Sequence, residues 1–238
     1  HPETLLRVVK ERPNNRMRDI PINNPEVLDG LNNFLWMYKE RDEIAKHHQL
    51  HSQGRDIDWF TGEQYRDVIV KQDTKHEGFP DECRNYNMKP EQMVKSRNGD
   101  PTYVAESIRK WTEYTTILQS VLFTRFNALT SLYPPQGFIS WHNNCNAPAY
   151  NLVFTWSETG DGQFMYLDTK TGDTVVMKDR KGWQCKAGYF GSYDEEPEKL
   201  VYHTASTDCW RITVSYVFNR EEMSLGLQED VIEEIKSK

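Results

Sequence analysis

The fold of this chain is decided in a stretch that runs from Phe138 to Trp156 and reads FISWHNNCNAPAYNLVFTW. Its two ends, residues 138–142 and 150–156, are rich in β-branched and aromatic side chains and flank a polar segment, which is typical of two strands joined by a loop. The pattern continues, and we predict further strands at 163–167, 174–177, 183–190, 200–203 and 210–218. Short strands separated by polar or glycine turns indicate a β-sandwich or a small β-barrel.

The first half of the chain has helical periodicity instead. Asn24 followed by Pro25 marks a helix start, and apolar residues then recur at helical spacing. Asp100 and Pro101 open a long helix, which we expect to stop before the prolines at 134 and 135. Helices followed by strands indicate an α+β fold in a single domain. We therefore expect a helical support region over 1–132, a β core over 133–220 and a C-terminal helix within 221–238.

Composition excludes several classes of protein. The 238 residues carry 29 Lys and Arg against 36 Asp and Glu, a net charge of −7 that disfavours duplex nucleic acid as a partner. No apolar run approaches the roughly 20 residues of a membrane-spanning helix. The four cysteines form no CxxC pair, which favours reduced thiols and a cytoplasmic protein. The chain begins at His1, so removal of a leader stays open, and the sequence does not fix the oligomeric state.

The candidate chemistry of the chain lies on two histidines that fall within predicted strands. His142 belongs to the first strand of the β core and is followed two positions later by Asn144. Because alternate residues of a strand project from the same face, we expect these two side chains to point the same way. His203 lies far along the chain, in the strand before the last one.

The last two predicted strands add an arginine. If the turn between them centres on Thr207, His203 and Arg211 lie directly opposite each other and share a face. Arg211, Thr213 and Ser215 would then form a polar stripe along the last strand. Such a stripe suits the lumen of a barrel that binds an anion, and it also suits a strand that faces solvent.

The ordered set of Trp-His-x-Asn at 141–144, a distant strand histidine and a later arginine resembles the iron(II)/2-oxoglutarate-dependent oxygenases. More closely, the segments FISWHNN (138–144), APAY (147–150) and FTWS (154–157) look like the small 2-oxoglutarate oxygenase-like proteins of T4-like cyanophages. The resemblance covers roughly residues 130–220. It implies a double-stranded β-helix, a jelly-roll or cupin-like barrel, with Fe(II) as the metal, 2-oxoglutarate as the cosubstrate and ascorbate as a reductant. It also implies hydroxylation of a small-molecule or peptide substrate.

The resemblance assigns roles to individual residues. His142 and His203 match the two histidine ligands of the iron, which bind through neutral imidazole nitrogens. Arg211 matches the residue that pairs with the distal carboxylate of 2-oxoglutarate, because a guanidinium can hold a carboxylate through two hydrogen bonds. Thr213 matches a hydroxyl position of the family near that carboxylate, and Tyr133 is a further candidate for the same group.

Asn144 departs from the family pattern, which has a carboxylate at this position. The amide oxygen of Asn144 could be the third metal ligand, or the side chain could stand aside and leave water on the metal. A halogenase would need that position for a halide, which the amide should crowd. A third reading is a catalytically inactive β-helix protein that binds a small anion or a partner. Release of succinate from 2-oxoglutarate distinguishes an enzyme from such a binding protein.

Overall fold

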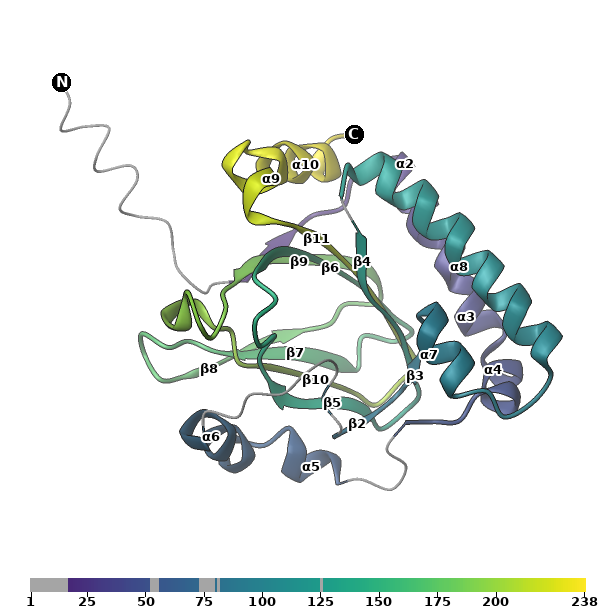
Figure 1. Cartoon of the computed structure of the whole chain (residues 1–238), viewed down its shortest axis with the longest axis horizontal. Coiled ribbons are helices and arrows are strands. Elements are labelled where there is room, and N and C mark those ends of the chain that lie inside the picture. Colours follow the sequence, from purple (N-terminus) through teal and green to yellow (C-terminus); the bar gives the residue numbers. More distant parts are fainter. Residues whose placement is uncertain (1–16, 52–55, 73–79, 81, 125) are drawn as a thin grey trace.

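The computed structural model describes residues 17–51, 56–72, 80, 82–124 and 126–238 (Figure 1). Within these residues, two antiparallel sheets face each other as the two walls of a jelly-roll barrel, and helices cover their outer faces. The chain therefore has the α+β fold that the sequence predicted. No helix in the described part of the chain is both long and apolar enough to cross a bilayer.

The larger sheet has the strand order β1-β9-β6-β11-β4-β3 and the smaller sheet has the order β2-β5-β10-β7-β8, counted over the described residues. From β4 to β11 consecutive strands alternate between the two sheets, except that β7 and β8 follow each other in the chain and pair within the smaller sheet. The strands are β1 (Arg18–Ile20), β2 (Cys83–Arg84), β3 (Tyr86–Asn87), β4 (Phe126–Tyr133), β5 (Gly137–His142), β6 (Ala149–Ser157), β7 (Gly162–Leu167), β8 (Thr174–Lys178), β9 (Gly182–Phe190), β10 (His203–Thr207) and β11 (Arg211–Phe218).

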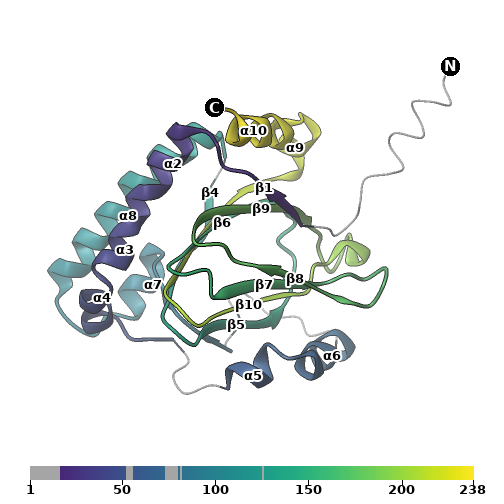
Figure 2. The same cartoon turned by 180° about the vertical axis from the view of Figure 1, so that it is seen from behind.

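Two groups of helices support the barrel (Figures 1 and 2). α2, α3 and α8 pack beside the larger sheet, whereas α5 and α6 lie under β5 of the smaller sheet. The helices are α2 (Pro25–Asn32), α3 (Trp36–Lys39), α4 (Arg41–His47), α5 (Ile57–Phe60), α6 (Glu63–Gln72), α7 (Pro90–Lys95), α8 (Pro101–Leu122), α9 (Arg220–Ser224) and α10 (Leu227–Lys236), with 3-10 turns at Asn33–Leu35 and Pro197–Lys199. The helix starts predicted at Asn24 and Asp100 are confirmed, because both side chains cap backbone N–H groups.

The main hydrophobic core lies between the larger sheet and its helices. Along β11, Ile212, Val214 and Tyr216 face this core and are completely buried. The alternate residues, Arg211, Thr213 and Ser215, face the interior of the barrel and line a cavity there. The polar stripe that the sequence predicted along this strand therefore faces the barrel lumen and not the solvent.

The region expected to be helical over 1–132 contains four strands, β1 to β4, so the boundary at residue 132 was wrong. The long helix α8 ends at Leu122, capped by Phe123 in the left-handed conformation (φ 54°), and β4 begins at Phe126. A left-handed cap on a phenylalanine gives no glycine signal in the sequence. The apolar residues from 126 onward are compatible with a helix or with a strand. They form a strand because they pair with β11. The C-terminal helix forms as α9 and α10, which meet at Gly226 (φ 76°).

Candidate metal and cosubstrate site

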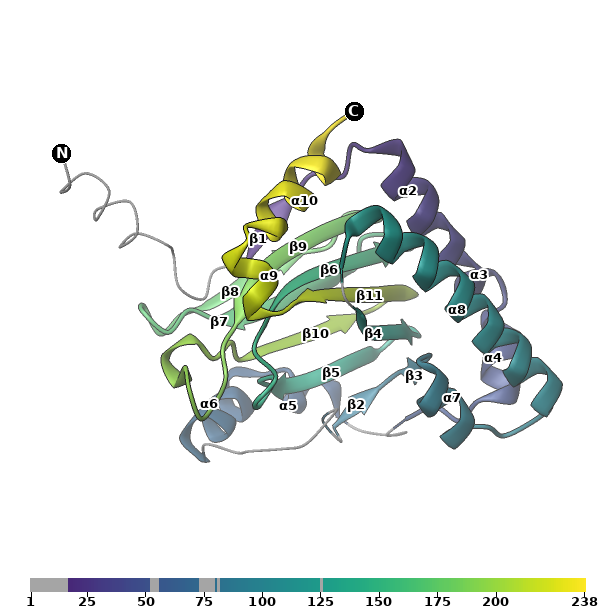
Figure 3. The ribbon, with the colours of Figure 1, turned by 45° about the horizontal axis from the view of Figure 1, so that its top comes forward.

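The interior of the barrel contains a cavity of about 640 Å³ between the two sheets. One wall is formed by β5, β7 and β10 of the smaller sheet, and the opposite wall by β4, β6 and β11 of the larger sheet. Figure 1 shows these strands on either side of a common interior, and Figure 3 shows α7 beside β3. The residues at the start of α7 complete the lining.

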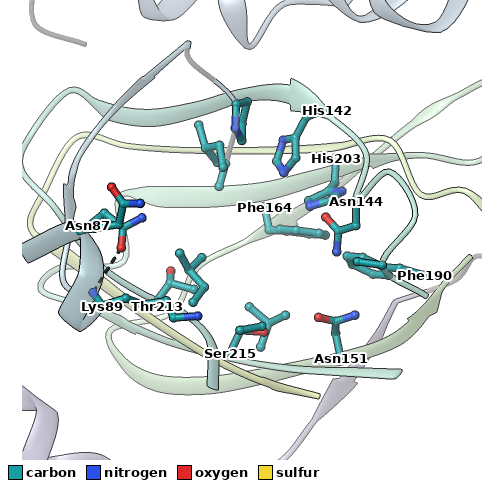
Figure 4. Close-up of a pocket in the computed structure, with 18 of the residues that line it drawn as sticks. Asn87, Lys89, His142, Asn144, Asn151, Phe164, Phe190, His203, Thr213 and Ser215 are labelled. Atoms are coloured by element: carbon teal, nitrogen blue, oxygen red, sulfur yellow. Dashed lines mark hydrogen bonds between the residues drawn. The ribbon is translucent and has the colours of Figure 1, made fainter. Parts of the chain in front are cut away.

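His142 and His203 meet at the wall of this cavity (Figure 4). His142 ends β5 and His203 begins β10, and pairing of these strands places the two ring centroids 4.1 Å apart. The Nδ1 atom of His142 lies 2.7 Å from the carbonyl oxygen of Ser140, and that of His203 lies 2.8 Å from the carbonyl oxygen of Val201. A carbonyl oxygen only accepts, so this geometry assigns the protons to Nδ1 and the lone pairs to Nε2. Histidines that bind metals are oriented in this way.

Aromatic side chains fix the position of His203. The ring of Phe190 lies 4.9 Å from the imidazole of His203, and the ring of Phe164 lies 5.7 Å from it, both measured between centroids. Both phenylalanines are buried, and both line the same cavity. They shield the imidazoles from water on this side, which strengthens any polar interaction made there.

Asn144 lines the cavity beside the two imidazoles, although it lies beyond the end of β5 (Figure 4). The turn is held by its neighbour Asn143, which is buried, donates to the hydroxyl of Tyr193 at 3.0 Å and accepts from the N–H of Cys145 at 2.8 Å. Cys145 adopts a positive φ of 53°, which reverses the chain. The expected convergence of His142 and Asn144 is therefore found, through a turn rather than through strand alternation.

These donors define what the site can hold. Among the described residues, no group of three or more His, Cys, Asp and Glu side chains is arranged to bind a metal ion. His142, His203 and Asn144 offer two imidazole nitrogens and one amide oxygen, all of them neutral. Imidazole nitrogens are suitable ligands for iron, so this donor set fits a divalent iron ion. Because none of the three donors carries a negative charge, the charge that balances the metal would come from a bound anionic ligand.

Arg211 and its neighbours lie on the larger sheet. Arg211 on β11 is the pairing partner of Tyr133 on β4, and its guanidinium carbon lies 5.9 Å from the centre of that ring. Its Nη1 atom donates to Oγ1 of Thr213 at 3.2 Å. Burial raises the pKa of Tyr133 to about 12, so the phenol stays neutral at ordinary pH. The structure thus brings Arg211, Thr213 and Tyr133 together at the cavity wall.

The main partner of Arg211 is Asp179, which no pattern in the sequence indicates. The Nε atom of Arg211 donates to Oδ2 of Asp179 at 2.7 Å, and Nη2 donates to Oδ1 at 3.3 Å. Lys186 completes the cluster, with Nζ 3.7 Å from Oδ1 of Asp179, and all three side chains are buried. Besides Arg211 itself, the signal of this cluster in the sequence is a lysine, Lys186, within the apolar strand β9.

The predicted hairpin between His203 and Arg211 is wrong. β10 pairs with β5 and β7, whereas β11 pairs with β4 and β6, so the two residues lie on opposite sheets. The turn residues after Thr207 lead the chain from one sheet to the other, and the N–H of Asp208 donates to the carbonyl of Asp161 at 2.8 Å. Both His203 and Arg211 nevertheless line the same cavity.

Comparison with known proteins gives distant structural neighbours. No family model matches the chain, and no curated protein matches its sequence. Solved structures similar to this chain include the Drosophila melanogaster CENP-C cupin domain, with 11% sequence identity and a TM-score of 0.27 over 38% of this chain and 55% of that one. They also include a prolyl hydroxylase in complex with a hypoxia inducible factor peptide fragment from Trichoplax adhaerens (10%, 0.34, 82% and 94%) and a Pseudomonas putida prolyl-4-hydroxylase (13%, 0.31, 77% and 99%). The chain thus spans little more than half of the CENP-C domain. At these TM-scores the neighbours support no conclusion about its reaction.

Proposed function

We propose that this chain is a nonhaem Fe(II)- and 2-oxoglutarate-dependent oxygenase. The observation that supports the proposal best is that two imidazoles from segments far apart in the sequence lie 4.1 Å apart, between ring centroids, at the wall of one cavity. Both rings are oriented through Nδ1 by backbone carbonyls, which leaves Nε2 as the coordinating nitrogen. The resemblance to the oxygenase-like proteins of T4-like cyanophages is part of this proposal.

The metal would be held by His142 and His203, with the amide oxygen of Asn144 or a water in the third place. When bound, Fe(II) and 2-oxoglutarate would activate dioxygen, the oxidant that converts a C–H bond of the substrate into an alcohol while 2-oxoglutarate is oxidised to succinate and carbon dioxide, with ascorbate as a reductant for the metal. The protein contributes position and shielding. Phe164 and Phe190 keep water away from His203, and the two sheets hold reacting groups in a fixed relation.

The distal carboxylate of 2-oxoglutarate would lie toward the larger sheet, where Arg211, Thr213 and Tyr133 line the cavity. The substrate would enter beside α7, where Lys89 and Gln92 add polar groups to the lining. A cavity of about 640 Å³ accommodates the cosubstrate together with a small molecule or one side chain of a peptide.

Anaerobic titration of Fe(II) and 2-oxoglutarate into the protein tests the proposal. We expect a visible charge-transfer band from the chelated cosubstrate, and release of succinate when oxygen and ascorbate are admitted. His203→Ala should abolish both signals, and His51→Ala, which changes an exposed histidine outside the cavity, should leave both unchanged. Absence of the band and of succinate in the unmodified protein would overturn the proposal.

A second candidate function is a non-catalytic protein that binds a small anion in the same cavity. Two observations favour it: the position of the usual carboxylate ligand is occupied by Asn144, and Arg211 already holds a carboxylate within the protein. This candidate predicts binding of an anion without any release of succinate, whatever metal is added.

A further inference from the structure

A second, smaller pocket lies beside α7 and adjoins the barrel cavity. It has a volume of about 280 Å³, and its lining is polar apart from Leu50. The lining includes three residues with amide side chains, Gln49, Asn87 and Gln92, and one lysine, Lys95. Asn87 and Gln92 also line the cavity, so the two pockets meet at these side chains. The smaller pocket, here called the α7 groove, thus lies where a substrate would enter the barrel.

One wall of the α7 groove is the chain segment around Gln49, which is tied to the end of α7. The N–H of Gln49 donates to the carbonyl oxygen of Ser96 at 2.7 Å. The preceding residue, His48, forms an antiparallel bridge with Arg97, and its Nδ1 atom lies 3.3 Å from the hydroxyl oxygen of Ser96. His48 is buried, whereas Gln49 and Lys95 are exposed. The groove is therefore open to solvent, and backbone contacts hold its walls together.

The α7 groove carries a positive charge that no carboxylate of its lining balances. Lys95 lies three residues after Gln92 on α7, so both side chains lie on one face of the helix. The side chain of Lys95 makes no hydrogen bond or ion pair within the described part of the chain, and no Asp or Glu among the described residues lines the groove. Glu91, one turn before Lys95, lines the cavity instead, and the described contacts include no ion pair between the two.

Lys89 continues the positive charge from the groove into the cavity. It lies directly before α7, lines the cavity, and is found near Asn87 on the side away from His142 (Figure 4). Its ammonium group makes no ion pair within the described residues. Burial lowers the pKa of Lys89, and the charge of Glu91 acts in the opposite direction. The path from the groove into the cavity thus has two lysines and one glutamate beside it, a balance that favours an acidic ligand over a basic one.

We propose that the α7 groove binds the flanking segment of an acidic peptide whose reacting side chain enters the barrel cavity. This inference rests on the proposed function, and it narrows the substrate to a peptide with an Asp or Glu that pairs with Lys95. The amide side chains of the groove both donate and accept hydrogen bonds, as a peptide group does. A single lysine matches the one charge of a carboxylate better than the charge of about −2 on a phosphate group.

Selection from a peptide library tests the inference. The purified protein, with and without Co(II) and 2-oxoglutarate, is mixed with random octapeptides that are capped at both ends and include phosphoserine, and the bound peptides are sequenced by mass spectrometry. We expect Asp and Glu to be enriched at least about threefold at one position, the effect of an exposed ion pair. Lys95→Glu should enrich Lys and Arg there instead. The matched control is Lys46→Glu, at an exposed lysine of α4 that lines neither pocket, which should recover the same peptides as the unmodified protein.

A double-mutant cycle provides a readout that a purely structural role of Lys95 would not give. One recovered peptide is synthesised with glutamate and with glutamine at the enriched position, and its binding is measured by fluorescence anisotropy. Lys95→Gln should weaken binding of the glutamate peptide about two- to fivefold and leave binding of the glutamine peptide unchanged. Salt at about 0.5 M should remove most of this difference, because it screens exposed charges. Equal weakening of both peptides would show that Lys95 acts only through the fold.

Three results of the selection would overturn the inference: no enrichment of acidic residues, the same peptides recovered by Lys95→Glu, or enrichment of phosphoserine above Asp and Glu. Release of succinate, measured separately with Fe(II), distinguishes this failure from that of the proposed function. If acidic peptides bind through Lys95 but no succinate is released, the oxygenase proposal fails and the groove stands as a peptide-binding site. If succinate is released but acidic peptides are not enriched, the oxygenase proposal stands and the assignment of the groove fails.

Discussion

Asp179 and Arg211 form a two-pronged ion pair inside the barrel, with Nε to Oδ2 at 2.7 Å and Nη2 to Oδ1 at 3.3 Å. The side chain of Asp179 is completely buried, and that of Arg211 is 3% exposed. Arg211, which matches the residue that pairs with the cosubstrate carboxylate in the oxygenase family, thus also contributes to the stability of the fold through this ion pair. Because each charge compensates the other where water is excluded, removing either one leaves an uncompensated charge in the interior.

Asp179→Asn should lower the free energy of unfolding by about 3–5 kcal/mol, the typical cost of breaking a buried ion pair. The substitution leaves Arg211 and Lys186 without a negative charge between them. Chemical denaturation measures the effect. Asp173→Asn, an exposed aspartate directly before β8, whereas Asp179 directly follows that strand, is the control and should change stability by less than about 0.5 kcal/mol. A loss below about 1 kcal/mol in Asp179→Asn would contradict the compensating role of this carboxylate.

Gly162→Ala should destabilise the protein by about 1–3 kcal/mol through overpacking. A methyl group at this position would lie 2.5 Å from Oδ2 of Asp179 and 3.1 Å from Oγ1 of Thr207. Asp179 cannot move aside freely because Arg211 holds both of its oxygens. In a double-mutant cycle with Asp179→Ala, which opens the space, the cost of Gly162→Ala should fall by at least about 0.5 kcal/mol. Strictly additive losses would show that the two sites are not coupled.

Asn144→Asp should tighten binding of Fe(II), or of Co(II) as its substitute, by at least about tenfold, because a carboxylate supplies the negative charge that the present donors lack. Anaerobic metal titration monitored by absorbance measures the change. The control is Asn151→Asp, which adds the same charge to the opposite wall of the cavity. If Asn151→Asp tightened binding as strongly, the effect would come from the charge of the cavity and not from a ligand at position 144.

Lys186 should make stability depend on pH. Its pKa of about 8 in the folded protein lies below the ordinary value near 10.4 of an unfolded chain. At a pH between these two pKa values the unfolded chain binds more protons than the folded protein does. The contribution of this group to the free energy of unfolding therefore rises with pH. The stability of the unmodified protein relative to Lys186→Met should therefore increase by about 2–3 kcal/mol from pH 7 to pH 10.

Denaturation of both proteins across this pH range checks the expectation. Burial raises the pKa of Tyr133 and of the Cys185 thiol, but these groups are present in both proteins and their contributions cancel in the difference. A difference that stays flat between pH 7 and pH 10 would show that Lys186 keeps its ordinary pKa in the fold.

The sequence by itself determined the local structure and the candidate metal ligands. Asn24 and Asp100 cap the helices that begin after them, and the alternation of apolar and polar residues fixed the spans of β5, β6, β9 and β11 to within one residue at most ends. These signals act between residues a few positions apart, which is the range over which capping and strand alternation operate. His142, Asn144 and Arg211 could be singled out for the same reason, since each lies within or next to a segment with a strong local pattern.

Only the tertiary structure decided which segments pair and which charges meet. The apolar run of β4 fits the period of a helix as well as that of a strand, and only its pairing with β11 makes it a strand. Turn residues between His203 and Arg211 predict one hairpin, whereas the chain crosses to the other sheet between them. Asp179 and Lys186 flank the turn between β8 and β9, but Arg211 lies 32 residues beyond Asp179 on another strand, and no local rule connects it with them. Their contact depends on barrel closure, which is a balance of long-range burial and pairing that short-range propensities do not encode.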